Sequence, residues 1–364
     1  MATLTDYAVA PGKYLAEWLE ETSTTQQEAA NRLGFSRKHV NEIVNGRAPV
    51  TSETALRLER LTGIPADSWV RFEARYQLDL ARLHDDAELR GHAPKIPPTV
   101  SKYLRDLGAT KATLRSPATL VADFLKYHGC STWESFEDQV VNESKGEFAL
   151  AALKENNASL DRVACATWLR AGEQHEAFER GRSFSFDQAG LLALLPDLRE
   201  RASVPDRALL GDLTEMLARV GVVYMFVDAP EKLPIYGMTR WIEKRVPVIQ
   251  QSGRRLKDGF IIWAFFHEIG HILHDPRGDL HFEFTSERKR TSAAEKAANE
   301  FAFETLFGAS GLEPFNGLSS DSAIERAAKR LGVAPGVAVQ QLHRRRKLDY
   351  AYGNRLFVEL LWEG

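Results

Sequence analysis

The chain has 364 residues, 44% of them hydrophobic, which is enough for two or three domains with cores of their own. Its two cysteines, Cys130 and Cys165, stand far apart, which argues against a disulfide framework or a thiolate zinc site and favours a reducing cytoplasm. A net charge of −3 does not indicate a nucleic-acid binder, and no apolar run approaches the roughly 20 residues of a membrane span. We therefore expect a cytoplasmic protein without membrane contact, and charge has to be considered segment by segment.

Residues 11–66 are patterned as a set of short helices that begin near Ser, Thr or Gly and often end at Gly. Only Gly34 and Phe35 separate the middle two helices, which is the form of a helix-turn-helix. Ser36 is placed to cap the second of these helices. The predicted core of this small unit consists of Ala29, Ala30, Leu33, Val40 and Ile43.

Basic side chains concentrate around the second helix of this pair. Between residues 32 and 47, Arg32, Arg37, Lys38 and Arg47 accompany a single acid, Glu42. Such side chains are typical of a recognition helix that reads base edges and phosphates in the major groove. A solvated surface helix would show the same charges, so the pattern alone leaves that alternative open. The predicted base contacts are Gln26, Arg37, Lys38 and Asn41, and the predicted phosphate contacts are Asn45 and Arg47.

The whole segment, Pro11 and Gly12 followed by TQQEAANRLGFSRKHVNEIVNGRAP, resembles the Xre/Cro-type helix-turn-helix, most closely its HigA-like antitoxin form. The resemblance implies a five-helix DNA-binding domain over residues 1–90. It also implies that this domain binds a double-stranded DNA operator as a homodimer on paired half-sites. Because the resemblance is closest to antitoxins, a toxin protein is a further possible partner.

The rest of the chain changes pattern twice. Three prolines between positions 94 and 98 mark a boundary, so residues 91–115 are predicted to be a linker. Residues 116–215 are helical in pattern and predict a packed middle domain. Strand-like runs at 221–230 and 246–252 predict a small sheet within the last domain, residues 216–364. The expected fold class is therefore mainly α with a small α+β part.

One stretch of the last domain, WAFFHEIGHILHD, combines an apolar helix with metal-binding residue types. His267 and His271 are four residues apart, so both imidazoles lie on one helical face and can share one metal ion. Glu268 follows the first ligand, where its carboxylate can accept a proton from a water as general base. The alternative is a set of polar residues on a buried helix, which is costly because unpaired buried polar groups lose about 1–3 kcal/mol each.

A third protein ligand is needed, and Glu295 is the predicted one. It lies on a second helix-patterned segment, SAAEKAANEFAFETLFG, far enough along the chain to return to the first helix. Asn299, one helical turn later, is predicted to orient a metal-ligating side chain by a hydrogen bond without binding the metal itself. Glu295 also stands in capping-box spacing from Ser292, and that alternative stays open. Two His and one Glu suit zinc as the expected ion and manganese as the other. Other nearby candidates for the third ligand are His274, Asp275, Asp279, His281, Glu283 and Glu287.

HEIGH followed by EKAANEFAFETL resembles the ImmA/IrrE family of bacterial metallo-endopeptidases, whose pattern is HExGH and then ExxANxFA. The matching residues are His267, Glu268, Gly270, His271, Glu295, Ala298, Asn299, Phe301 and Ala302. The resemblance implies a zincin-like domain with Glu268 as catalytic base and His267, His271 and Glu295 as metal ligands. One departure is that Leu306, Phe307 and Gly308 stand where the family often has a Leu-Leu-x-Pro run, which leaves one wall of the cleft undefined.

The two resemblances support two hypotheses. In the first, the chain is a DNA-binding regulator whose metal-dependent endopeptidase makes a limited cut in a regulatory protein in response to stress. That protein is a helix-turn-helix repressor or the chain itself, cut near residues 91–98. In the second, the chain is an antitoxin or transcriptional repressor whose metal-binding domain only senses a ligand or binds a toxin. The sequence leaves enzymatic activity undecided between them.

Overall fold

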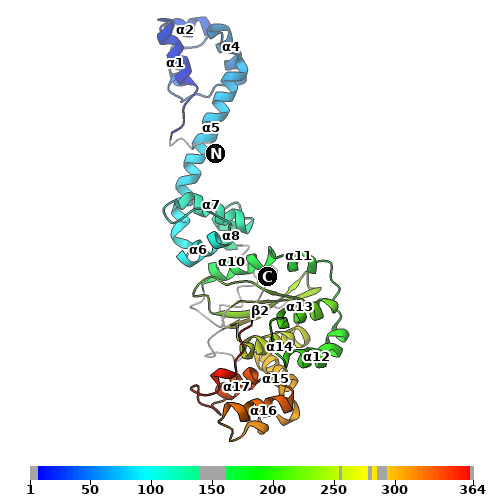
Figure 1. Ribbon diagram of the computed structural model, residues 1–364. Helices are drawn as coiled ribbons and strands as arrows, with labels where there is room; N and C mark the ends of the chain where they lie inside the picture. Colours follow the sequence, from blue (N-terminus) through cyan, green and yellow to red (C-terminus); the bar gives the residue numbers. More distant parts are fainter. Residues whose placement is uncertain (1–6, 139–160, 254–255, 278–280, 285–292, 361–364) are drawn as a thin grey trace. The chain divides into compact units, whose positions relative to one another are not determined.

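The protein is represented by a computed structural model that describes residues 7–138, 161–253, 256–277, 281–284 and 293–360. The chain divides into two compact units, Met1–Lys95 with Leu114–Ala122, and Ile96–Thr113 with Asp123–Gly364. Helices predominate and one small sheet lies in the second unit, so the predicted fold class is confirmed (Figure 1). Within the described ranges, no helix combines the length and apolar character that a membrane crossing requires.

The first unit contains five helices in succession over residues 12–92. They are α1 (Gly12–Glu21), α2 (Gln26–Leu33), α3 (Arg37–Val44), α4 (Ser52–Thr62) and α5 (Ala66–His92). Side-chain caps fix where three of them begin, because Thr25, Ser36 and Thr51 each accept a hydrogen bond from the backbone N–H three residues on. Gly34 ends α2 with a φ of 68°, a left-handed conformation that lets the chain turn directly into α3.

The core of the first unit is a cluster of small and branched side chains around one tryptophan, Trp69, which is fully buried. The five residues predicted to form this core, Ala29, Ala30, Leu33, Val40 and Ile43, are all buried, as predicted. Gly12 lets α1 approach α3 closely, since a Cβ there would collide with the Ile43 backbone carbonyl. The helix-turn-helix is therefore held in shape by its own small core.

The second unit surrounds its sheet with helices. Its elements before the sheet are α6 (Pro98–Asp106), α7 (Pro117–His128, shared with the first unit), α8 (Trp133–Phe136), α10 (Arg162–Glu173), α11 (Glu176–Gly181), α12 (Gln188–Ala202) and α13 (Leu209–Arg219). After the third strand come α14 (Asp258–His274), α15 (Ala293–Phe307), α16 (Asp321–Leu331) and α17 (Pro335–Arg344). Short 3₁₀ turns lie at Ala93–Lys95, Gly308–Ser310, Glu313–Phe315 and Asn354–Leu356.

The sheet has four strands, β1 (Val223–Phe226), β2 (Ile235–Ile242), β3 (Val246–Gln251) and β4 (His281–Phe284), in the order β1-β3-β2-β4. β1 is parallel to β3, and β2 is antiparallel to both β3 and β4. The predicted strands at 221–230 and 246–252 are confirmed as β1 and β3. The residue pattern alone marked no strand at β2, and at β4 it indicated only candidate metal ligands.

Successive residues of the strands face different helices, because side chains alternate across a sheet. On one face, Arg240 and Gln250 reach α10: Arg240 Nη1 lies 3.2 Å from Glu173 Oε1, and Gln250 Nε2 donates to the Trp168 carbonyl at 2.9 Å. On the other face, the ring of Tyr224 contacts Phe265 of α14. Figure 1 shows α10 and α11 on one side of the sheet and α14 on the other. The sheet thus supports α14 from one side.

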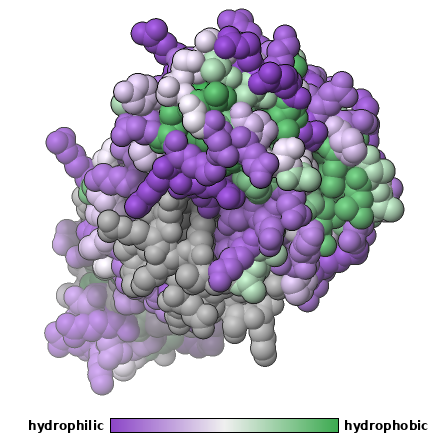
Figure 2. All heavy atoms as spheres, turned by 90° about the horizontal axis from the view of Figure 1, so that it is seen from below, coloured by the Kyte–Doolittle hydropathy of each residue, from purple (hydrophilic) through white to green (hydrophobic). Residues whose placement is uncertain are grey.

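The predicted domain boundaries remain predictions, but the elements within them are now known. Residues 91–115, predicted to be a linker, contain the end of α5, the 3₁₀ turn Ala93–Lys95 and α6. In the predicted middle domain, α10 is tied to the sheet by the hydrogen bonds described above. On the face of the second unit that Figure 2 shows, hydrophilic side chains predominate over apolar ones.

Candidate metal centre and nucleic-acid interface

Helix α14 is buried along nearly its whole length. Its apolar side chains pack in the main core of the second unit, against α15, α17 and the sheet. His267 and Glu268 are 0% exposed and His271 is 2% exposed, so three ionisable groups lie inside this core. Buried polar groups are stable only with partners, and their partners define the site.

The three predicted ligands come together. His267 Nε2 lies 3.1 Å from His271 Nε2. Glu295, brought in by α15, places Oε2 3.5 Å from His267 Nε2 and Oε1 3.4 Å from His271 Nε2. Ligands at about 2.0–2.1 Å around a tetrahedral ion lie about 3.3 Å from one another. The spacing of the three donors therefore fits one divalent cation, and they form a group that could hold a metal ion.

The far nitrogen of His271 has an acidic partner. Its Nδ1 lies 2.5 Å from Asp275 Oδ2, one turn further along the chain. The ring of His281, from β4, stacks on the His271 ring at a centroid distance of 4.1 Å, and its Nε2 lies 3.2 Å from the same Asp275 oxygen. A carboxylate on the far nitrogen of a ligating histidine fixes the ring and its tautomer. Among the described residues, His267 Nδ1 has no hydrogen-bond partner.

The electrostatics of the cluster favour positive charge at its centre. Burial lowers the pKa of His271, but the hydrogen bonds that its ring donates to the Asp275 and Glu295 carboxylates outweigh burial and raise the pKa to about 10. Burial also opposes ionisation of Glu295, yet the two histidines hold its pKa well below the ordinary value. The carboxylates thus stabilise a cationic group between them. A divalent ion would supply that charge.

Glu268 is held from the sheet. Thr239 Oγ1, on β2, donates a hydrogen bond of 2.6 Å to Glu268 Oε2, and both residues are fully buried. Gly237 lies next to the other oxygen, where a Cβ would come within 3.4 Å of Oε1. The carboxylate is therefore fixed beside the histidine pair by two residues of β2. The residue pattern alone did not indicate this contact, because it depends on how β2 packs against α14.

Asn299 does not touch the carboxylate of Glu295. Its Nδ2 donates to the backbone carbonyl of Glu295 at 2.6 Å, and its Oδ1 accepts from Arg344 Nη2 at 3.2 Å. Asn299 thus joins α17 to the first turn of α15, and a role in positioning Glu295 stays a prediction. Of the other third-ligand candidates, Asp275 and His281 lie beside His271, and His274 Nδ1 lies 3.3 Å from the Gly270 carbonyl. Ser292, Asp279 and Glu287, together with the side chain of Glu283, lie outside the described residues.

In the first unit, the predicted DNA contacts lie on α2, on α3 and just after it. Arg37, Lys38, Asn41, Asn45 and Arg47 are exposed, and Gln26 is half-buried. Asn41 Nδ2 donates to Gln26 Oε1 at 3.2 Å, so the first turn of α2 and the middle of α3 present neighbouring amides. Asn45 Nδ2 donates to the Asn41 carbonyl at 2.7 Å. The basic side chains of α3 are exposed, with Lys38 Nζ 3.8 Å from Glu42 Oε1, and their contact with DNA stays a prediction.

Two family models match this chain. The model described as helix-turn-helix matches residues 15–69, and the model described as the IrrE N-terminal-like domain matches residues 260–343. Virulence-associated protein I of Dichelobacter nodosus is 36% identical over 75 residues, which cover 20% of this chain and 69% of that protein. The chain belongs to the helix-turn-helix family and carries an IrrE-like domain.

Solved structures similar to the helix-turn-helix domain include two of HigA proteins. The Pseudomonas aeruginosa antitoxin HigA with the higBA promoter is 28% identical, and the match covers 22% of this chain and 87% of that one, with a TM-score of 0.21. An addiction module antidote protein of the HigA family from Coxiella burnetii is 26% identical over 22% of this chain and 90% of that one, with a TM-score of 0.22. With scores this low, the two structures add nothing to the family assignment.

The family assignment and the geometry agree on two functional parts. The helix-turn-helix domain is a DNA-binding domain, and its match covers α3 with the predicted contacts. The match to the IrrE-like domain begins at Phe260 and ends at His343, so it includes the donor cluster. A DNA-binding domain joined to a peptidase-like domain fits a regulator.

Proposed function

We propose that the chain is a DNA-binding transcriptional regulator whose IrrE-like domain is a metal-dependent endopeptidase that makes a limited cut in a regulatory protein. The observation that carries the proposal is the buried cluster of His267, His271 and Glu295 with Glu268 beside it, held by Thr239. Three fully buried ionisable side chains in an apolar core, with the half-buried Glu295 beside them, are typical of a functional site.

In this proposal, His267, His271 and Glu295 hold a divalent ion, zinc or manganese, and Asp275 keeps His271 oriented. When bound, such an ion polarises a carbonyl group and makes water more acidic. Glu268 accepts a proton from the attacking water while the water oxygen bonds to the peptide carbonyl carbon. Glu268 then returns that proton to the leaving nitrogen as the C–N bond breaks, which balances the hydrolysis.

The substrate must be an extended segment of a protein. Among the strands that the structure describes, β4 lies at one edge of the sheet, and its first residue, His281, stacks on His271. An edge strand of this kind can accept an extended peptide by main-chain hydrogen bonds. Residues 91–98 of the chain itself lie in the end of α5, a 3₁₀ turn and the start of α6. A cut there would require those turns to unwind, so a separate repressor is the favoured substrate and the chain itself is the second.

The test measures metal content and cleavage on the same full-length samples. Wild type, Glu268→Gln and His267→Ala are loaded with zinc or manganese, washed, and assayed by plasma mass spectrometry and by intact mass after incubation with candidate helix-turn-helix repressors. We expect one ion per chain in wild type and Glu268→Gln, none in His267→Ala, and cleavage in wild type alone. Self-cutting would give two fragments whose masses add up to the 40.9 kDa of the chain plus one water.

Matched controls remove the same chemical groups elsewhere. The control variants are Glu325→Gln, at an exposed position of α16, and His84→Ala, at an exposed position of α5. Both should behave as wild type. An ion bound by wild type without any cutting would favour a repressor or antitoxin whose metal-binding domain senses a ligand or binds a toxin. An ion retained by His267→Ala, or lost equally from the control variants, would contradict the proposed ligands.

A further inference from the structure

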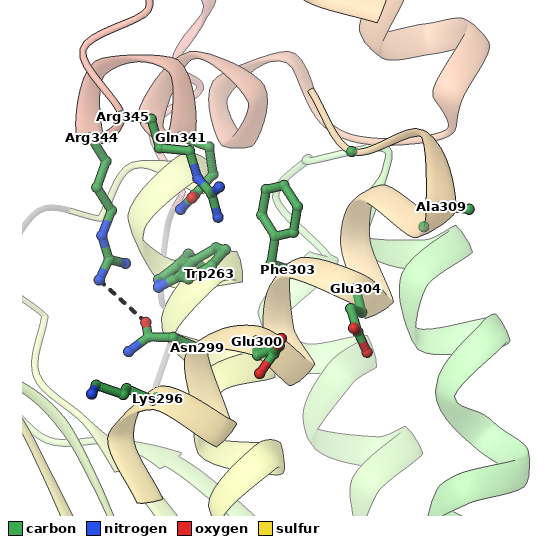
Figure 3. A pocket seen from close by; sticks show the side chains of 12 residues that line it. Trp263, Lys296, Asn299, Glu300, Phe303, Glu304, Ala309, Gln341, Arg344 and Arg345 are labelled. Atoms are coloured by element: carbon green, nitrogen blue, oxygen red, sulfur yellow. Dashed lines mark hydrogen bonds between the residues drawn. The ribbon is translucent and has the colours of Figure 1, made fainter. Parts of the chain in front are cut away.

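A polar pocket of about 1120 Å³ opens between α14, α15 and α17, and its lining includes residues one helical turn from the proposed metal ligands but none of the ligands themselves. Figure 3 shows its walls, which come from α14, α15, the 3₁₀ turn after α15, and α17. The lining residues that matter here are Trp263, Lys296, Glu300, Phe303, Glu304 and Arg344. A volume of this size accommodates several side chains of a peptide.

The inner wall of the pocket is tied to the proposed metal ligands. Trp263 precedes His267 by four residues on α14, and Asn299 follows Glu295 by four residues on α15. One helical turn rises about 5.4 Å, so both wall residues lie within about a turn of a ligand on their own helix. Asn299 also bonds the Glu295 carbonyl directly. A peptide bond placed at the donor cluster would have neighbouring side chains within reach of this pocket.

One wall of the pocket contains the buried indole N–H of Trp263. The residue is 3% exposed, and among the described residues Nε1 has no hydrogen-bond acceptor. Buried tryptophan N–H groups normally donate to a partner. Arg344 crosses the indole ring at 5.2 Å and donates to Asn299, which holds its guanidinium at the same end of the pocket. This end therefore offers donors and positive charge to an acceptor that carries negative charge.

The charged side chains of the pocket are not evenly spread. In Figure 3, Lys296, Trp263 and Arg344 lie toward one end and Glu304 toward the other, while Glu300, Phe303 and the Arg345 guanidinium over the Phe303 ring lie between them. Lys296 has no hydrogen bond or ion pair to another residue in the part of the chain that the structure describes. A carboxylate is the group that such an end would hold, through charge-assisted hydrogen bonds.

We propose that this pocket is a substrate subsite that takes an acidic side chain, Glu or Asp, close to the peptide bond to be cut. The proposal rests on the proposed peptidase function. It assigns Lys296, Arg344 and the Trp263 N–H to the carboxylate, and Phe303 to the aliphatic part of the neighbouring residue. It follows that the substrates are proteins with an acidic residue at the cleavage point.

The test measures peptide binding to full-length, zinc-loaded Glu268→Gln protein, which should hold peptides without cutting them. Two pools of dye-labelled octapeptides are compared by fluorescence polarisation, one with a fixed Glu and one with a fixed Gln, the other positions being randomised without acidic residues. We expect the Glu pool to bind about tenfold tighter, as for a charge-assisted hydrogen bond. Adding Lys296→Glu should abolish that preference, and Trp263→Phe should reduce it while keeping an aromatic ring.

Lys329→Glu is the matched control, because Lys329 is exposed on α16 and does not line the pocket. This control should keep the preference. Equal binding of the two pools, or a preference that survives Lys296→Glu, overturns the subsite. The same pools and the candidate repressors are then given to zinc-loaded wild type. A preference without cleavage of either refutes the peptidase and leaves the subsite standing, whereas cleavage without a preference does the reverse.

Discussion

Thr239 Oγ1 lies 2.6 Å from Glu268 Oε2, so a hydroxyl group on β2 donates to the carboxylate that follows the first histidine of α14. Both groups are fully buried, and the bond crosses from the sheet to the helix. A carboxylate that accepts a hydrogen bond from a fixed donor has one oxygen occupied, and the orientation of the whole carboxylate group is fixed. The sheet therefore contributes to the proposed general base as well as supporting the helix.

Thr239→Val should lower the cleavage rate about tenfold or more while leaving the bound metal in place. Valine keeps the shape of threonine but removes the donor, and a hydrogen bond to a charged group contributes about 1.5–3 kcal/mol. Thr239→Ser keeps a hydroxyl and should retain most of the activity. The measurement is kcat on a substrate found with wild type, with metal content determined on the same samples. Equal losses in the valine and serine variants would show that the hydroxyl is not what matters.

Asp275→Asn should weaken zinc binding about 10- to 100-fold, the range found when the partner of a ligating histidine is changed. The carboxylate on His271 Nδ1 would become an amide, which no longer stabilises positive charge on the ring. Competition with a chromophoric chelator measures the change. Asp197→Asn, an exposed position on α12, is the control and should bind zinc as wild type does. An unchanged affinity in Asp275→Asn would remove Asp275 from the site.

Asp258 should make the stability of the second unit depend on pH. Burial raises its pKa to about 6 from an ordinary 3.8, although backbone N–H groups such as that of Val358, 3.0 Å from Oδ1, oppose the shift. Because the folded state binds this proton more tightly than the unfolded chain, the contribution of Asp258 to stability is greatest below about pH 4. It falls as pH rises to about 6, by an amount on the order of 3 kcal/mol.

Denaturant unfolding of wild type and Asp258→Asn, with chelator present, isolates this contribution because the amide does not titrate. The free energy of unfolding of wild type relative to the variant should decrease between pH 4 and pH 7. Asp197→Asn serves again as the exposed control, and its curve should run parallel to that of wild type. If Asp258→Asn also runs parallel to wild type, the proton on Asp258 is not linked to folding.

Arg37→Ala and Lys38→Ala should weaken binding to a duplex that wild type selects from a random pool. A residue that only contacts phosphate should lower affinity on all sequences and reduce the salt slope by about 1. A residue that reads a base should relax specificity at one position, with a loss of about 1–3 kcal/mol for the correct base. Arg60→Ala, exposed on α4, is the control. Unchanged binding in both α3 variants would place the interface elsewhere.

The sequence by itself determined the features that depend on a few neighbouring residues. The helix-turn-helix followed from Gly34, from the cap at Ser36 and from apolar spacing, because the period of a helix sets which residues share a face. The same period put His267 and His271 side by side. Local geometry of this kind is encoded in the chain without reference to the rest of the fold.

Only the tertiary structure decided which distant groups complete the site. Glu295 reaches the histidines because α15 packs on α14, and Thr239 reaches Glu268 because β2 lies beneath that helix. His281 meets Asp275 through a strand that the pattern did not reveal. Packing between elements selects these contacts, and it depends on the shape of both partners and on every connection between them. The spacing of residues along the chain does not specify the shapes of the packed elements or the paths of the connections.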